Sequence, residues 1–149
     1  MRGIKHFDEF ITGKIVKKQS PDRSRAAYLI KESDNSYNNL LEKIQKIELS
    51  DINANDFVKS CYDLLMELIR AKMLLEGYNA SGFGAHEAEV SYMRTLDFNE
   101  KDVQFADQLR FFRNGILYYG TILDQVYAEK VIAFTKKIYS KLKKILKKS

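Results

Sequence analysis

Hydrophobic positions along this 149-residue chain recur mostly at the spacing of amphipathic helices. One clear example is the series Tyr37, Leu40, Leu41, Ile44 and Ile47, whose members are three residues or one residue apart. This periodicity predicts helices near residues 21–48, 56–76, 86–95, 99–119 and 124–146. A shorter helix is expected at the start of the chain, around Phe7, Phe10, Ile11 and Ile15. No segment has a pattern that predicts a β-strand.

Residues typical of helix ends lie between these periodic segments. Ser20-Pro21-Asp22 favours a helix start, because serine can cap, proline suits the first helical position and an acid favours the positive end of the dipole. Asn99 is a second predicted cap, and Gly77 and Gly120 are predicted helix ends. We therefore expect an all-α, up-and-down bundle of four to six helices that forms one domain over residues 1–149.

The composition restricts the chemistry and the compartment. Cys61 is the single cysteine, so an intrachain disulfide and a cysteine-based zinc site are excluded, and we expect it to be a small buried residue. The N-terminus does not resemble a secretory signal, because acids stand where an apolar segment should be. No apolar run reaches the roughly 18–20 residues that span a bilayer, so we expect a cytoplasmic protein without a membrane partner.

Charge is distributed unevenly along the chain. Residues 1–25 hold seven Lys/Arg against three acids, the middle of the chain is acidic, and residues 135–149 hold seven lysines and no acid. The lysine-rich end is predicted to be an amphipathic helix with Ile138, Leu142, Ile145 and Leu146 on its apolar face. Its lysines could form a solvated face that complements the helix dipole, bind RNA phosphates, or contact an anionic membrane surface.

The segment Leu109–Gly120, LRFFRNGILYYG, contains the strongest candidate for a site. On a helix, residues 110, 114 and 118 share one face and residue 113 borders it. Arg110, Arg113, Asn114 and Tyr118 would then form a strip of fork-shaped donors, an amide and a phenol, with Tyr119 beside it. Such a strip could bind phosphate through the arginines and stack a base on tyrosine.

The alternative for Arg113 is an internal ion pair. A guanidinium within a mostly apolar stretch is costly to desolvate unless an anionic or polar group meets it. An acid on a neighbouring helix, such as Asp63 or Glu67, could be that group. Both interpretations are open on the sequence alone.

His86 is one of two histidines in the chain, with His6. Histidine can act as an acid or a base near neutral pH, but His86 could equally be a helix-start residue that bonds the neighbouring loop. His86-Glu87 lacks the second histidine of a HExxH zinc motif, so we predict neither a metal nor another cofactor.

The segment 84–130, GAHEAEVSYMRTLDF…LRFFRNGILYYGTILDQVYAEK, resembles the HEPN superfamily of small all-helical proteins. It is most similar to archaeal members with a His-Glu-Ala turn, a helix bearing an Arg-Asn phrase, and an aromatic-glycine ending. The resemblance implies a helical bundle that forms a homodimer through the motif-bearing region. Many members are metal-independent endoribonucleases or toxins, others are partners of a minimal nucleotidyltransferase, and others are inactive copies that bind RNA. By this resemblance, Arg113 and Asn114 match the family's arginine and its polar neighbour.

The family's histidine, four to six residues after the arginine, is absent here, since positions 118–120 are Tyr, Tyr and Gly. An ordinary tyrosine is ionised in only about one molecule per thousand at pH 7 and is a poor base. We therefore expect a HEPN-like copy that binds RNA or a partner protein. An active ribonuclease would need Tyr118, or His86 folded over the Arg113 cleft, as its base. A purely structural or protein-interaction dimer is the alternative.

Overall fold

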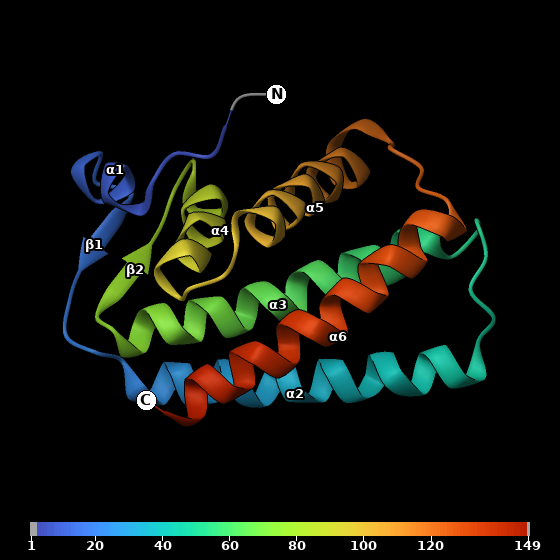
Figure 1. Ribbon diagram of the computed structural model, residues 1–149, viewed down its shortest axis with the longest axis horizontal. Helices are drawn as coiled ribbons and strands as arrows, with labels where there is room; N and C mark the ends of the chain where they lie inside the picture. Colours follow the sequence, from blue (N-terminus) through green and yellow to red (C-terminus); the bar gives the residue numbers. More distant parts are fainter. Residues whose placement is uncertain (1–2, 149) are drawn as a thin grey trace.

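The computed structural model describes residues 3–148 and, within them, six helices and two short strands (Figure 1). The helices are α1 (Phe7–Thr12), α2 (Arg23–Lys46), α3 (Ala54–Leu75), α4 (Ala85–Thr95), α5 (Glu100–Tyr119) and α6 (Gln125–Lys147). The strands are β1 (Val16–Lys18) and β2 (Tyr78–Ala80). The all-α helical bundle expected from the sequence is confirmed, and its long helices begin and end within a few residues of the predicted positions.

Helix α3 is the centre of the bundle. It packs against α2, α4, α5 and α6, and Figure 1 shows it between the pair α2 and α6 and the pair α4 and α5. Its sequence predicts one apolar face, yet Val58, Tyr62, Met66 and Met73 are buried in addition to that face. A helix that is apolar around most of its circumference can be stable only with neighbours on several sides. Side chains from all six helices meet in the main core around it.

Three of the described helices, α2, α5 and α6, are capped at their starts by short acidic or amide side chains. Asp22, Asn99 and Asp124 each accept a hydrogen bond from the backbone N–H three residues later. At the start of α2 the cap is therefore Asp22, not Ser20, and Pro21 precedes the helix. Gly120 ends α5 in the left-handed conformation, with φ +67°, as predicted for a helix-ending glycine.

The expectation of no strand was wrong. β1 and β2 pair in antiparallel register, with Val16 opposite Ala80 and Lys18 opposite Tyr78. Each strand has only three residues, too few to show the alternation that identifies a strand in a sequence. Ile15 does not belong to the first helix, because α1 ends at Thr12 and Lys14 has a positive φ of 62°.

Helix α6 packs along α3 with Ile138 and Leu142 buried. Its apolar face is thus part of the core, and two of its lysines pair with acids of other helices: Lys137 with Asp102 and Lys143 with Asp34, each at 2.8 Å. Among residues 3–148, the structure contains no helix that is both long enough and apolar enough to cross a membrane. Cys61 is fully buried, as predicted.

Candidate functional site

A pocket of about 240 Å³ lies where α3 meets α4 and the C-terminal half of α5. Four of the predicted site residues line it together: His86 from α4 and Arg113, Asn114 and Tyr118 from α5. The rest of the lining consists of Tyr62, Asp63, Met66, Glu67, Arg70 and Leu117. His86 thus shares a pocket with Arg113 although 27 positions separate them in the sequence.

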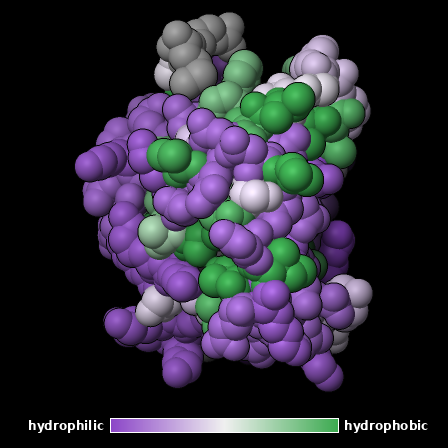
Figure 2. All heavy atoms as spheres, turned by 90° about the vertical axis from the view of Figure 1, so that its right-hand side faces the viewer, coloured by the Kyte–Doolittle hydropathy of each residue, from purple (hydrophilic) through white to green (hydrophobic). Residues whose placement is uncertain are grey.

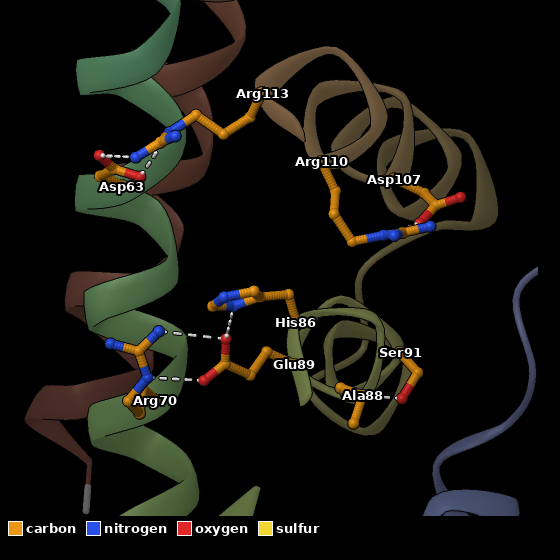
Figure 3. Close-up of polar contacts among 9 residues, drawn as sticks. All are labelled: Asp63, Arg70, His86, Ala88, Glu89, Ser91, Asp107, Arg110 and Arg113. Atoms are coloured by element: carbon orange, nitrogen blue, oxygen red, sulfur yellow. Dashed lines mark hydrogen bonds and ion pairs between the residues drawn. The ribbon is translucent and has the colours of Figure 1, made fainter. Parts of the chain in front are cut away.

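Arg113 forms an ion pair across the helix interface. Its Nε and Nη2 donate to the two carboxylate oxygens of Asp63 on α3, at 3.2 and 3.1 Å (Figure 3). Of the two acids that the sequence offered as an internal partner of Arg113, the structure pairs it with Asp63. The Arg113 side chain is 20% exposed and that of Asp63 is 50% exposed, so the acid faces water more than the arginine does. The third guanidinium nitrogen, Nη1, is buried and has no hydrogen-bond partner among the described residues.

A second and more deeply buried pair joins α3 to α4 below the first one in Figure 3. Arg70 Nε and Nη2 donate to Glu89 at 2.6 and 3.1 Å, and the His86 Nδ1 lies 3.0 Å from Glu89 Oε1. Glu89 is only 2% exposed. Burial alone would raise the pKa of Glu89, but the hydrogen bonds from His86 and Arg70, with the charge of Arg70, hold it below its ordinary value.

This arrangement fixes the orientation of the His86 imidazole. An ionised carboxylate can only accept hydrogen bonds, so Nδ1 carries the hydrogen and donates it to Glu89. In the neutral ring Nε2 is then the proton-accepting nitrogen. Figure 3 shows the ring between α4 and α3, between the two ion pairs. A buried carboxylate that sets the tautomer of a histidine is the geometry that prepares an imidazole as a base.

Sequence reasoning missed the hydroxyl of Tyr62. This side chain is 5% exposed, and its hydroxyl has no hydrogen-bond partner within residues 3–148. Burial raises the pKa of Tyr62 well above its usual range, with a smaller contribution from the charge of Glu89, so the hydroxyl stays protonated and can donate. Nothing in the local sequence distinguishes Tyr62 from the core residues around it.

Glu67, the other acid predicted as a possible partner of Arg113, does not pair with it and lines another part of the pocket. Burial raises the pKa of Glu67, the nearby Glu32 and Asp63 raise it further, and Arg70 opposes them. The lining therefore holds two arginines, Arg70 and Arg113, against two acids. An anion can bind strongly here only if it replaces one of the acids beside an arginine.

Arg110 and Tyr119 do not belong to this pocket, contrary to the predicted strip on one helix face. Arg110 Nε donates to Asp107, one turn earlier on α5, at 2.7 Å, and Asp107 is buried. Tyr119 is 84% exposed at the end of α5. The spacing rule failed because the buried carboxylate of Asp107 draws the Arg110 guanidinium back along its own helix (Figure 3).

The fold and this pocket define an all-α helical bundle with a polar pocket between three of its helices. Comparisons with protein-family models, curated proteins and solved structures find no match. Among the described residues, no group of three or more His, Cys, Asp or Glu side chains is arranged to hold a metal ion.

Proposed function

We propose that this chain is a HEPN-like RNA-binding protein that holds an RNA phosphate in the pocket between α3, α4 and α5. The observation that carries the proposal is the buried Nη1 of Arg113, a charged donor without an acceptor. The second buried side-chain atom without a partner in residues 3–148, the Tyr62 hydroxyl, belongs to the same pocket lining. Leaving a buried donor unpaired costs about 1–3 kcal/mol, and more for a charged group. A phosphate oxygen at Arg113 would supply the acceptor that Nη1 lacks.

The ion pair with Asp63 is compatible with a phosphate at Arg113. Because the Asp63 carboxylate is half exposed, water can solvate it when it turns away, and the phosphate would then compensate the charge of the mostly buried Arg113. A phosphate carries more charge and can form two parallel hydrogen bonds with a guanidinium. Once Asp63 turns away from Nη2, a phosphate could pair with Nη2 and the unpaired Nη1 of Arg113 together.

We further propose that the protein acts as a homodimer through the end of the bundle that bears the α5–α6 connection. Apolar side chains lie at the surface of this end, among polar ones (Figure 2). Leu117, Tyr118, Ile122 and Val126 are all at least half exposed there. Leu117 and Tyr118 also line the pocket, so a partner copy on this surface would border the proposed RNA site. Sedimentation equilibrium of an Ile122→Lys, Val126→Lys variant tests this; a wild-type chain that stays monomeric would contradict it.

Binding of a short single-stranded RNA, measured by fluorescence polarisation, tests the phosphate proposal. Arg113→Ala should weaken binding about tenfold or more, as expected for loss of a charge-assisted contact. Asp63→Asn should strengthen it, because the amide no longer competes for the guanidinium. Lys46→Ala is the matched control, since it removes one positive charge and one ion pair, to Glu42, outside the pocket. Unchanged affinity in both Arg113→Ala and Asp63→Asn would reject the proposal and leave Arg113 a structural residue.

The Glu89–His86 contact supports a second candidate function, metal-independent RNA cleavage. In this step the ribose 2′-hydroxyl gives its proton to His86 Nε2 and its oxygen attacks the phosphorus. The bond to the 5′-oxygen breaks and that oxygen takes a proton from water, while Arg113 stabilises the added negative charge. The products are a 2′,3′-cyclic phosphate and a free 5′-hydroxyl.

Cleavage is distinguished from binding by His86→Ala, assayed with excess chelator. If the protein cleaves, this variant should lose activity by at least about a hundredfold while it keeps RNA affinity. Glu89→Gln should also reduce cleavage, because it removes the charge that orients the imidazole. Cleavage that is equally fast in His86→Ala would exclude His86 as the base, and then Tyr118→Phe tests the other candidate.

A further inference from the structure

A second and larger hollow, of about 570 Å³, lies between the N-terminal half of α5 and the middle of α6. The two helices are bridged by long side chains and have little close backbone packing: Phe105 packs on Phe134 at 4.5 Å between ring centroids, and Lys137 bonds Asp102. Both helices pack on α3 instead. The result is an open groove with an apolar floor. None of its lining residues lines the pocket between α3, α4 and α5.

The groove walls repeat at helical spacing. On α5 the wall is Lys101, Gln104, Phe105 and Gln108, and on α6 it is Lys130, Ala133, Phe134 and Lys137. Each set follows the i, i+3, i+4, i+7 pattern of a helix face that packs against another helix. Seven residues of helix extend about 10 Å, or two turns. The groove thus has the shape of a helix–helix seam with a position for one more helix.

Lysines border this apolar floor. Lys101, Lys130 and Lys137 stand against one acid, Asp102, which is already paired with Lys137 at 2.8 Å. Within residues 3–148, no acid forms an ion pair with Lys101 or Lys130. The charge complementary to this rim is negative.

We propose that the α5–α6 groove docks an amphipathic helix of a partner protein, with apolar residues toward Phe105 and Phe134 and acidic residues toward the lysines. Nucleic acid fits less well, because base stacking needs free ring faces. Phe134 is only 8% exposed and packs at an inclined angle on Phe105. A flat membrane surface would touch the lysines without reaching the floor of a groove.

Fluorescence polarisation with a pair of synthetic peptides tests this inference. One is a capped, fluorescein-labelled helix of two Leu-faced heptads with Glu on both flanks, and the other has Lys in place of every Glu. The Glu peptide should bind at least about tenfold more tightly at low salt, and the difference should shrink as salt is added. The variant Lys101→Glu, Lys130→Glu should reverse the preference. The matched control, Lys144→Glu, Lys147→Glu on α6 outside the groove lining, should keep it.

Circular dichroism of each variant checks that these exposed substitutions leave the fold intact. Equal affinity for both peptides, or an unchanged preference in the Lys101→Glu, Lys130→Glu variant, would overturn the inference. Displacement of the Glu peptide by equimolar dodecanoate would also overturn it, by assigning the groove to acyl anions. Arg113→Ala should leave peptide binding unchanged, because Arg113 does not line the groove. Peptide binding and RNA binding can therefore be tested independently.

Discussion

Replacement of Glu89 should lower the free energy of unfolding, because this buried carboxylate binds two residues of the pocket lining, Arg70 and His86. Its carboxylate is 2% exposed and accepts two hydrogen bonds from Arg70, at 2.6 and 3.1 Å, and one from His86. Removing one member of a fully buried ion pair costs about 3–5 kcal/mol. The Arg70 side chain is 28% exposed, so water can partly compensate its charge, and we expect Glu89→Ala to cost about 2–3 kcal/mol. For a chain of this length that lowers the Tm by roughly 4–12 °C.

The contribution of Glu89 should also depend on pH. Because the folded state holds the pKa of Glu89 below its ordinary value of 4.5, the ionised form stabilises the fold. That stabilisation is complete above the unfolded pKa and is lost as the pH falls through the folded one. The difference in unfolding free energy between wild type and Glu89→Gln should therefore be constant near neutral pH and shrink in acid.

Urea unfolding followed by circular dichroism measures both effects. The control is Glu100→Ala, which breaks the pair with Arg94 at a carboxylate that is 53% exposed. This control should cost no more than about 1 kcal/mol. A cost for Glu89→Ala as small as that of the control, or a difference that persists unchanged in acid, would refute the assigned role of the buried carboxylate.

Three further substitutions or reactions test other parts of the structure. Gly77→Ala should destabilise by more than about 2 kcal/mol, because φ is +83° and the added Cβ would lie 2.6 Å from the Gln19 carbonyl oxygen. Gly82→Ala, at φ +78° in open space, should cost only about 1 kcal/mol. If urea unfolding shows that both alanine variants lose the same stability, the contact of residue 77 with Gln19 is contradicted. Tyr62→Phe should leave stability unchanged or raise it by up to about 1 kcal/mol, since its hydroxyl has no partner in residues 3–148, while RNA binding weakens; a clear loss of stability would show a missed partner. Burial raises the pKa of the Cys61 thiol to about 11, so a thiol reagent should modify it only as the protein unfolds, and rapid modification of the native protein would contradict its burial.

The helices could be read from the sequence because their signals are local. The apolar spacing in residues 37–47 and the cap at Asn99 depend only on neighbours within two turns. The three-residue strands gave no such signal, since Val16 and Ala80 pair across 64 positions of chain. At the start of α2, the adjacent residues Ser20, Pro21 and Asp22 are each typical of a helix start. In the structure the Asp22 side chain is the cap.

The sequence identified candidate residues of the site but not which of them contact one another. The Arg113-Asn114 phrase stands out because it interrupts a mostly apolar stretch, and His86 stands out because the chain has only two histidines. Asp63 could be suggested as a partner, yet it was not separable from Glu67 four residues later, since both lie on the same face of α3. Arg110 shows the limit of the helical-face rule, because a flexible side chain follows the nearest buried carboxylate.

The sequence by itself determined an all-α bundle, the positions of its long helices and the burial of Cys61, because periodicity, caps and hydrophobicity act over short distances along the chain. The tertiary structure decided which charges meet: Arg113 with Asp63, and Arg70 and His86 with Glu89. These pairs depend on how α4 and α5 are rotated and placed against α3, and that is fixed by the packing of the whole core. The pocket and the unpaired Arg113 Nη1 and Tyr62 hydroxyl follow from the same packing.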